Sequence, residues 1–163
     1  RIGRAVARRA RAFGMKIHYH DPVRLSDDLE EGAIYHANLD EMLPVVRFVS
    51  LHCPMSPDSR HLIGKRALDL LPRGAVLVNT ARGPLLDDEA VLAALDDGRL
   101  FAVGLDVYEG EPRLHDGYRK RRNCFLLPHL GSATVETRNA MGFRCLDNLD
   151  AIFRGDQAPD ALT

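Results

Sequence analysis

Arg82, Glu111 and His129 have side chains that could together bind an acid and move a proton. A guanidinium holds a carboxylate through two parallel hydrogen bonds and can polarise a neighbouring carbonyl. An imidazole can exchange a proton with a substrate oxygen, and a carboxylate beside it favours its protonated form. Each residue taken singly is equally compatible with an ordinary surface or structural role, so their location decides between the two interpretations.

The elements that precede these residues predict that location. Short apolar runs predict strands, and helical patterns lie between most of them. The predicted strands span residues 15–20, 33–36, 45–51, 75–79, 101–107 and 124–127. The predicted helices span residues 1–13, 38–43, 65–71, 87–97 and 132–153. Strands that alternate with helices indicate right-handed crossovers and an α/β fold with a parallel sheet covered on both faces.

Ligands of open parallel sheets bind beyond the carboxyl ends of the strands. Arg82 closely follows the predicted strand 75–79, and His129 closely follows the strand 124–127. Asp106 lies at the end of the strand 101–107, and Glu111 lies in the segment after it. The sequence therefore predicts an active site at this edge of the sheet.

Composition and charge exclude several classes of protein. The 163 residues are 45% hydrophobic and 28% charged, as expected for one globular domain, and the formal net charge of -1 argues against a protein that coats nucleic acid. Cys53, Cys124 and Cys145 are widely spaced, which argues against a disulfide framework or a zinc site and favours a reducing, cytoplasmic location. No apolar run approaches the roughly 18 residues that a membrane span needs, so no membrane partner is expected.

Half of a nucleotide-binding motif is visible near the start of the sequence. Asp21 lies 18 residues after Gly3, which is the spacing expected of the acidic residue that hydrogen-bonds the ribose of NAD. Gly3 would then be the third glycine of a Gly-x-Gly-x-x-Gly loop. The first two glycines and the strand that leads into them are not in this sequence, so the half motif is weak evidence by itself.

Three ordered segments resemble the D-isomer-specific 2-hydroxyacid dehydrogenases. They are LVNTARG at 77–83, GLDVYEGEP at 104–112 and LPHLGSAT at 127–134, and residues 51–56 with 61–63 resemble the adenine-side segment of the same family. The resemblance implies a Rossmann-type doubly wound parallel sheet, incomplete at its N-terminus because the first strand and most of the glycine loop are absent. It also implies that residues 1–163 form one dinucleotide-binding domain, a fragment without the family's substrate domain.

The resemblance assigns roles to individual residues. Arg82 would bind the substrate carboxylate and carbonyl, and Glu111 would orient and charge His129, the acid–base. The implied cofactor contacts are Arg1, Ile2, Gly3, Asp21, Cys53, Pro54, Thr80, Ala81, Arg82, Asp106, His129, Gly131 and Ser132. A carboxylate at Asp21 would repel a 2'-phosphate, so NAD is expected rather than NADP. No metal site is expected.

The implied reaction is hydride transfer between nicotinamide and C2 of a small 2-oxo or 2-hydroxy acid, as in glyoxylate/hydroxypyruvate reductases or phosphoglycerate dehydrogenases. By resemblance we expect a homodimer, and we expect little or no activity from this chain alone. Glu111 argues against formate, because formate dehydrogenases carry Gln at that position. An NAD-sensing corepressor-like scaffold of the same superfamily stays open as the alternative, since such proteins keep the Arg, the Glu and the His.

Other features favour structural interpretations. The arginine-rich residues 1–13 resemble a mitochondrial transit peptide, but Ile2, Val6, Ala10 and Phe13 favour an amphipathic helix packed on a sheet. The basic run 119–122 is expected in a solvated loop insertion, 112–123, rather than in a nuclear signal or a nucleic-acid patch. His18 and His20 share a strand face and are expected to be structural rather than metal ligands. The apolar positions expected in a core or an interface on the final helix are Met141, Cys145, Leu149 and Ile152.

Overall fold

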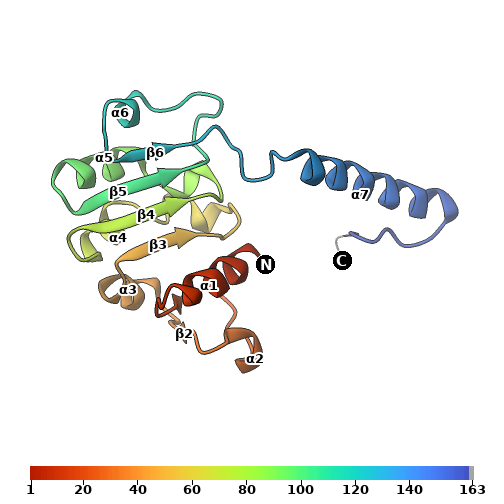
Figure 1. Cartoon of the computed structure of the whole chain (residues 1–163), viewed down its shortest axis with the longest axis horizontal. Helices are drawn as coiled ribbons and strands as arrows, with labels where there is room; N and C mark the ends of the chain where they lie inside the picture. Colours follow the sequence, from red (N-terminus) through yellow and green to blue (C-terminus); the bar gives the residue numbers. More distant parts are fainter. Residues whose placement is uncertain (162–163) are drawn as a thin grey trace. The chain divides into compact units, whose positions relative to one another are not determined.

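The computed structural model describes residues 1–161, and the chain divides after Pro128 into two units (Figure 1). The first unit holds all the strands of the described residues. Its largest sheet consists of β3 (Phe48–Leu51), β4 (Ala75–Asn79), β5 (Leu100–Leu105) and β6 (Cys124–Leu126), parallel and in that order. A separate parallel pair consists of β1 (His18–Tyr19) and β2 (Ile34–Tyr35).

Every predicted strand is present, but some are shorter than the apolar runs that predicted them. Residues 15–17 lie outside β1, since its ladder with β2 covers only two residue pairs. The predicted strand 45–51 starts at Phe48 because a 3-10 helix, η1 (Leu43–Val45), precedes it, with Pro44 at its start. The alternation of strands and helices nevertheless gives the expected Rossmann-type α/β fold.

The predicted helices are also present. They are α1 (Ile2–Ala12), α3 (Leu39–Met42), α4 (Lys65–Leu70) and α5 (Asp88–Asp96) in the first unit and α7 (Val135–Arg154) in the second. Asp87 caps α5, as its position predicted, by accepting a hydrogen bond from the Ala90 N–H at 3.2 Å. Short helices that the sequence did not predict are α2 (Asp27–Glu30), α6 (Asp116–Arg119), η2 (Pro57–Ser59) and η3 (Gly83–Leu85).

The prediction of a loop over residues 112–123 is wrong where α6 forms. The Tyr118 side chain is fully buried, and its hydroxyl donates to the Asp88 carboxylate at 2.7 Å. Arg121, from the basic run, pairs with Asp96 at the end of α5. A buried aromatic ring with a satisfied hydroxyl stabilises this helix, although it is only one turn long.

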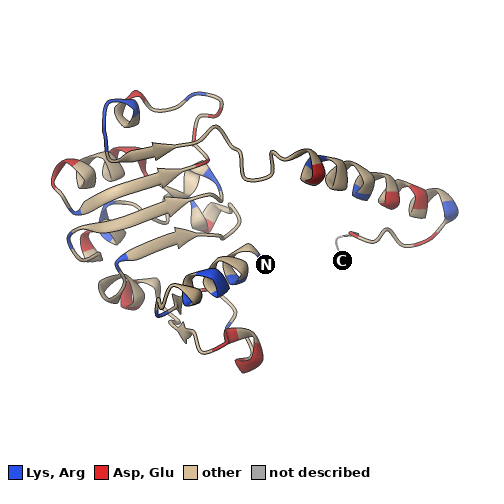
Figure 2. Ribbon diagram, in the orientation of Figure 1, with Lys and Arg blue, Asp and Glu red and all other residues tan. Residues whose placement is uncertain are grey.

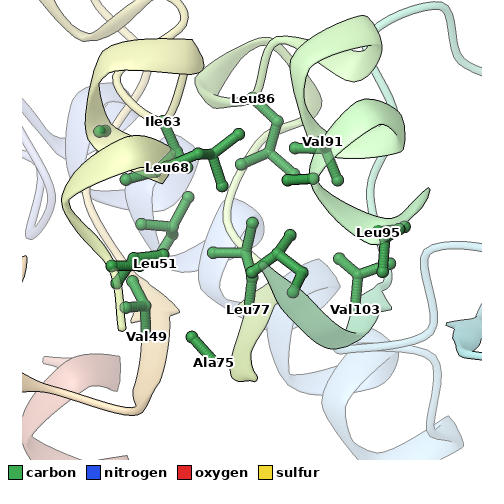
Figure 3. Packing of buried hydrophobic residues seen from close by; sticks show 14 of the residues in the cluster. Val49, Leu51, Ile63, Leu68, Ala75, Leu77, Leu86, Val91, Leu95 and Val103 are labelled. Carbon is green, nitrogen blue, oxygen red and sulfur yellow. The ribbon is translucent and has the colours of Figure 1, made fainter. Parts of the chain in front are cut away.

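The core lies between one face of the four-stranded sheet and the helices α4 and α5 (Figure 3). Alternate strand residues such as Val49, Leu77 and Val103 point into it, and Leu68 and Leu95 approach them from the helices. This layer holds the strand ends in a fixed order and thereby positions the loops that follow them.

The other face of the same sheet contradicts the expectation of two covered faces. Phe48 on β3 and Phe125 on β6 are 61% and 69% exposed, and Val76 and Val78 lie between them on β4. No helix among the described residues of the first unit buries these side chains. An apolar face of this kind is typical of a surface that another layer of protein covers.

Helix α1 forms where the sequence predicted it, but its apolar face does not pack as expected. Ile2 and Phe13 are 67% and 86% exposed, and no residue of α1 is fully buried. The half-buried side consists mainly of small residues, Gly3, Ala5, Ala7 and Ala10. Small side chains allow the helix backbone to lie close to its neighbours, and this determines which side faces inward.

The second unit contains α7, capped by Thr134, whose hydroxyl accepts from the Thr137 N–H at 3.2 Å. Figure 2 shows acidic and basic residues along this helix. Its apolar positions Met141, Leu149 and Ile152 are about half exposed and Cys145 is exposed, so they form no core within the described residues. None of the helices in the described part of the chain is both long and apolar enough to span a bilayer.

His18 in β1, His20 just after β1 and His36 just after β2 form a hydrogen-bonded cluster. The His18 Nδ1 lies 2.9 Å from the His36 Nε2, and the His20 Nδ1 lies 2.9 Å from the His36 carbonyl oxygen. Burial lowers the pKa of His18 from its ordinary value of 6.5, and the nearby charges of His36 and Lys16 lower it further. The imidazoles therefore join the two short strands, as the structural interpretation of His18 and His20 predicts.

Acidification is expected to loosen the β1–β2 pair. Because the pKa of His18 is lower in the folded state than in the unfolded state, the unfolded chain binds protons more readily, and stability falls as the pH decreases below about 6.5. Hydrogen exchange of the His36 and Ile34 amides, corrected for the intrinsic pH effect, should therefore accelerate between pH 7.5 and 5.5. His18→Gln should remove that pH dependence, because it removes the titrating imidazole, and His115→Gln should retain it; an identical pH response in the His18 variant would contradict the assignment.

Candidate active site

Asn79 at the end of β4 shapes the turn that carries Arg82. The Asn79 side chain is fully buried; its Oδ1 accepts from the Ala81 N–H at 3.0 Å, and its Nδ2 donates to the Arg82 carbonyl at 2.8 Å. The amide group thus bonds both ends of the turn, as a buried polar group must if it is to avoid a large desolvation penalty. The Arg82 side chain itself is exposed beyond the sheet edge.

The Arg82 turn packs tightly against the loop that follows β5. A Cβ atom added to Gly83 would lie 1.9 Å from the Tyr108 carbonyl carbon and 2.2 Å from the Glu109 nitrogen. Only glycine allows two backbones to approach this closely. The structure therefore brings the segment that contains Arg82 directly against the segment that leads to Glu111.

The loop after β5 has its own internal supports. The Tyr108 N–H donates to the Glu111 carboxylate at 2.9 Å, and the Tyr108 hydroxyl donates to the Leu127 carbonyl at 2.7 Å. Asp106 is buried at the start of this loop, and its N–H donates to the Asn79 carbonyl at 3.0 Å. Asp106 and Thr80 both line a hollow of about 340 Å³ that also extends along β4, β5 and β6 to residues such as Val76 and Ala102.

The remaining predicted residues of the first unit lie around the ends of β1 and β3. A Cβ added to Gly3 would contact the His52 side chain at 3.4 Å, so the first turn of α1 lies beside the end of β3. Burial raises the pKa of the next residue, Cys53, and the negative charge of Asp21 raises it further, so Asp21 lies near this thiol. Asp21 is exposed, and its carboxylate accepts from the Val23 N–H at 3.1 Å. The other predicted contacts here, Arg1, Ile2 and Pro54, are also exposed.

His129, Gly131 and Ser132 belong to the second unit. His129 is exposed and has a φ of 57°, in the left-handed region that non-glycine residues rarely occupy. A tight turn follows it, since the Ala133 N–H donates to the Leu130 carbonyl at 2.9 Å and the Arg138 Nε donates to the Ser132 carbonyl at 3.2 Å. Strained backbone at an exposed imidazole is typical of functional positions.

Sequence reasoning assigned no role to several residues that shape this edge. Asn79 could have been found, because a polar amide that ends an otherwise apolar strand must satisfy its hydrogen bonds when buried. Glu109 pairs with both Arg60 and His61. Glu109 and Arg60 are 49 positions apart in the sequence, so no local pattern indicates that they meet.

The residues at the sheet edge fit a dinucleotide. The first N–H groups of any α-helix have no partner within the helix, and α1 has no acidic residue in its first turn, so its start suits an anion. The ends of β1 and β3 add a carboxylate at Asp21 and a half-buried thiol at Cys53. No cluster of metal-ligating side chains occurs in the described part of the chain. An anion-binding helix start followed by a carboxylate at the next strand end suits a pyrophosphate and a ribose hydroxyl.

Comparisons with known proteins agree with this arrangement. The chain is 44% identical to glycerate dehydrogenase of Hyphomicrobium methylovorum, and the match covers 99% of this chain and 51% of that protein. A glyoxylate reductase structure from Paecilomyes thermophila superposes with a TM-score of 0.90 at 45% identity, covering 96% of this chain and 48% of that one.

A second solved structure is an NADPH-dependent glyoxylate/hydroxypyruvate reductase from Sinorhizobium meliloti, in complex with NADP and malonate. It superposes with a TM-score of 0.89 at 37% identity, covering 93% of this chain and 47% of that one. The chain thus spans about half the length of the relatives it matches. The family model described as "D-isomer specific 2-hydroxyacid dehydrogenase, NAD binding domain" matches residues 1–131, and we conclude that the chain belongs to this family.

Proposed function

We propose that this chain is the nucleotide-binding part of a longer enzyme that transfers a hydride between nicotinamide and C2 of a small 2-oxo or 2-hydroxy acid. The observation that supports this most directly is the close packing of the Arg82 turn on the loop of Glu111, through Gly83. Two segments that must act on one substrate are thereby held at a constant separation. Membership of the 2-hydroxyacid dehydrogenase family supports the same reaction.

Arg82 is the proposed anchor of the substrate acid. Its guanidinium donates through Nη1 to the Ala81 carbonyl at 2.6 Å, and Asn79 bonds both ends of the turn, so the side chain starts from a rigid base. Two N–H groups can bind the carboxylate, and a third can polarise the adjacent carbonyl. Positioning of this kind places C2 for hydride transfer without a covalent intermediate.

His129 is the proposed acid–base, and Glu111 its proposed partner. In the reductive direction the imidazolium donates a proton to the carbonyl oxygen, and in the oxidative direction the imidazole accepts the proton of the alcohol. A carboxylate at Glu111 favours the charged imidazole. The N–H of Tyr108 donates to that carboxylate and so determines where it lies.

The nicotinamide cofactor supplies the hydride. We propose that the first N–H groups of α1, near Arg1, Ile2 and Gly3, bind the pyrophosphate and that Asp21 accepts hydrogen bonds from the ribose. The remaining proposed contacts lie after β3, β4 and β5 and in the second unit: Cys53, Pro54, Thr80, Ala81, Asp106, Gly131 and Ser132. These groups orient the dinucleotide, and the half-buried ones among them exclude water.

We propose that the enzyme prefers NAD. An NADP site usually provides an Arg that binds the 2'-phosphate. Arg24 is the basic side chain nearest to Asp21 in sequence, but it is committed to Glu30 through bonds of 2.8 and 3.2 Å and lies over the Tyr35 ring. Arg24 and Tyr19 lower the pKa of Glu30 to about 2, so this pairing persists at neutral pH. Arg24 is therefore engaged elsewhere, and the charged group that the proposed ribose would meet at this strand end is the Asp21 carboxylate.

Asp21→Ser is expected to raise the ratio of kcat/KM for NADPH to that for NADH by about tenfold or more, because it removes the negative charge that would repel the 2'-phosphate of NADPH. Steady-state kinetics with both cofactors measures the ratio. Asp28→Ser, an exposed acid on α2, is the matched control and should leave the ratio unchanged. An unchanged ratio in the Asp21 variant would contradict the proposed ribose contact.

The substrate class, the location and the assembly are further parts of this proposal. We propose glyoxylate or hydroxypyruvate as substrates, because two of the similar solved structures are named as reductases of these acids. A cytoplasmic location is supported by three thiols that are free in the structure. A homodimer is supported by the exposed apolar face of the four-stranded sheet, and light scattering of the full-length polypeptide tests it.

The function is tested with the full-length polypeptide that contains this chain. NADH oxidation should be measured at 340 nm with glyoxylate and with hydroxypyruvate, and NADPH should be run in parallel. Turnover with either acid supports the proposal. Binding of NADH without turnover of any 2-oxo acid would instead favour a nucleotide-sensing scaffold.

A further inference from the structure

Glu109 joins two loops of the first unit, and the proposed mechanism does not use it. One carboxylate oxygen of Glu109 is ion-paired with Arg60, and the other lies 3.3 Å from the His61 Nε2. Arg60 and His61 come directly after η2, in the connection between β3 and α4, whereas Glu109 follows β5. In sequence, Glu109 lies between Asp106 and Glu111.

The backbone beside His61 is attached to the Arg82 turn. The His61 N–H donates to the Pro84 carbonyl at 2.8 Å, and the Ile63 N–H donates to the Leu85 carbonyl at 3.0 Å. His61 has a φ of 51°, in the left-handed region, which is unfavourable for a non-glycine residue. Its neighbours hold it in this conformation, and the imidazole then lies within reach of Glu109.

Residues 60–63 thus support two loops at once. Their backbone pairs with the residues just after Gly83, and their side chains bind Glu109. Burial by itself would raise the pKa of Glu109, but the hydrogen bonds and charges of Arg60 and His61 outweigh it and lower the pKa. The Glu109 carboxylate therefore stays ionised at neutral pH, and the pairing persists where the enzyme would work.

We propose that Glu109 is a positioning residue, which fixes the loop that carries Glu111 relative to the Arg82 turn by binding Arg60 and His61. This inference rests on the proposed function, because it assigns Glu109 to the same site. The Tyr108 N–H transmits the constraint, since Tyr108 is the neighbour of Glu109 and donates to the Glu111 carboxylate at 2.9 Å.

The expected effect follows from the geometry of the reaction. Arg82 binds the substrate carboxylate, and Glu111 orients the group that donates the proton. The separation between these two side chains must therefore match the substrate. Displacements of about 1 Å at such sites lower turnover by up to about 100-fold. Glu109 contacts none of the proposed cofactor residues through the interactions above, so its loss should lower kcat with little change in the KM for NADH.

The test compares variants of the full-length polypeptide. Glu109→Ala is expected to lower kcat about tenfold or more, and Glu109→Gln, which can still accept a hydrogen bond from Arg60, should lose less. The double variant Arg60→Ala, Glu109→Ala should show no larger fall in kcat than Glu109→Ala alone, since both changes remove the same ion pair. Glu89→Gln is the matched control: Glu89 pairs with His115 at 3.1 Å, takes part in none of the contacts described above for residues 60–63 and 108–111, and should leave kcat unchanged when replaced.

A second measurement separates this inference from the proposed function. Hydrogen exchange of the amides at 108–111 should accelerate in Glu109→Ala and not in the Glu89 variant, whether or not a substrate is known. An active wild type with an equally active Glu109→Ala variant would overturn the inference and leave the function intact. A wild type that reduces no 2-oxo acid would overturn the function, and exchange alone would then decide whether Glu109 holds the loop.

Discussion

His129→Ala is expected to lower kcat for 2-oxo acid reduction by about 100-fold or more in the full-length polypeptide. Without the imidazole, the developing alkoxide at C2 must take its proton from water. Hydride donation by the cofactor and binding of the acid at Arg82 do not need His129, so the KM for the acid should change little. Steady-state and single-turnover kinetics with NADH and glyoxylate measure both quantities.

Two controls make this result specific. His115→Ala, which removes an exposed imidazole paired with Glu89, should leave kcat unchanged. Binding of NADH, measured by fluorescence, should survive in the His129 variant. Turnover that stays within a factor of about 3 of the wild type would remove His129 from the mechanism, since general acid catalysis contributes far more than this.

The second large effect is expected at Gly83. In Gly83→Ala the new methyl group would lie 1.9 Å from the Tyr108 carbonyl carbon, and both partners are backbone atoms that no side-chain rotation can move. The two loops must separate, at a cost of about 3 kcal/mol or more, which corresponds to a fall in Tm of about 6–12 °C for a domain of this size. Separation also moves Arg82 away from the Glu111 loop, so kcat should fall at least tenfold in the molecules that remain folded.

Gly104→Ala on β5 is the matched control. A Cβ at that position would meet the nearest Val78 methyl group at 3.8 Å, which is ordinary van der Waals contact. Thermal unfolding and kcat of this variant should stay close to the wild type. Equal Tm values for the Gly83 variant and the wild type would show that the two loops do not pack as described.

Local sequence patterns were sufficient to predict most of the fold and to select candidate site residues. The strand 75–79 was predicted at its observed limits because an apolar run without proline or glycine leads to Asn79, and its residues alternate between buried and half-buried in the structure. The start of α5 was predicted because Asp87 is a strong cap followed by apolar residues at helical spacing. Arg82 and Glu111 were selected as candidates because loops after parallel strands carry the chemistry of such folds.

Contacts between distant residues were not predictable in the same way. The short helix α6 forms because Tyr118 finds a buried place and a carboxylate at Asp88, which lies 30 positions earlier. The exposed Phe48 and Phe125 looked like any other strand residues, since apolar residues are expected on both faces of a parallel sheet.

By itself, the sequence determined the order of strands and helices, the membership of the family and the chemical types of the groups at the strand ends. Periodicity, caps and ordered motifs act over a few residues, so they can be recognised without coordinates. Only the tertiary structure decided that Gly83 touches Tyr108 and that Glu109 reaches Arg60 and His61. Close packing brings such residues together from separate loops, and the distances that result depend on the whole fold rather than on any one segment.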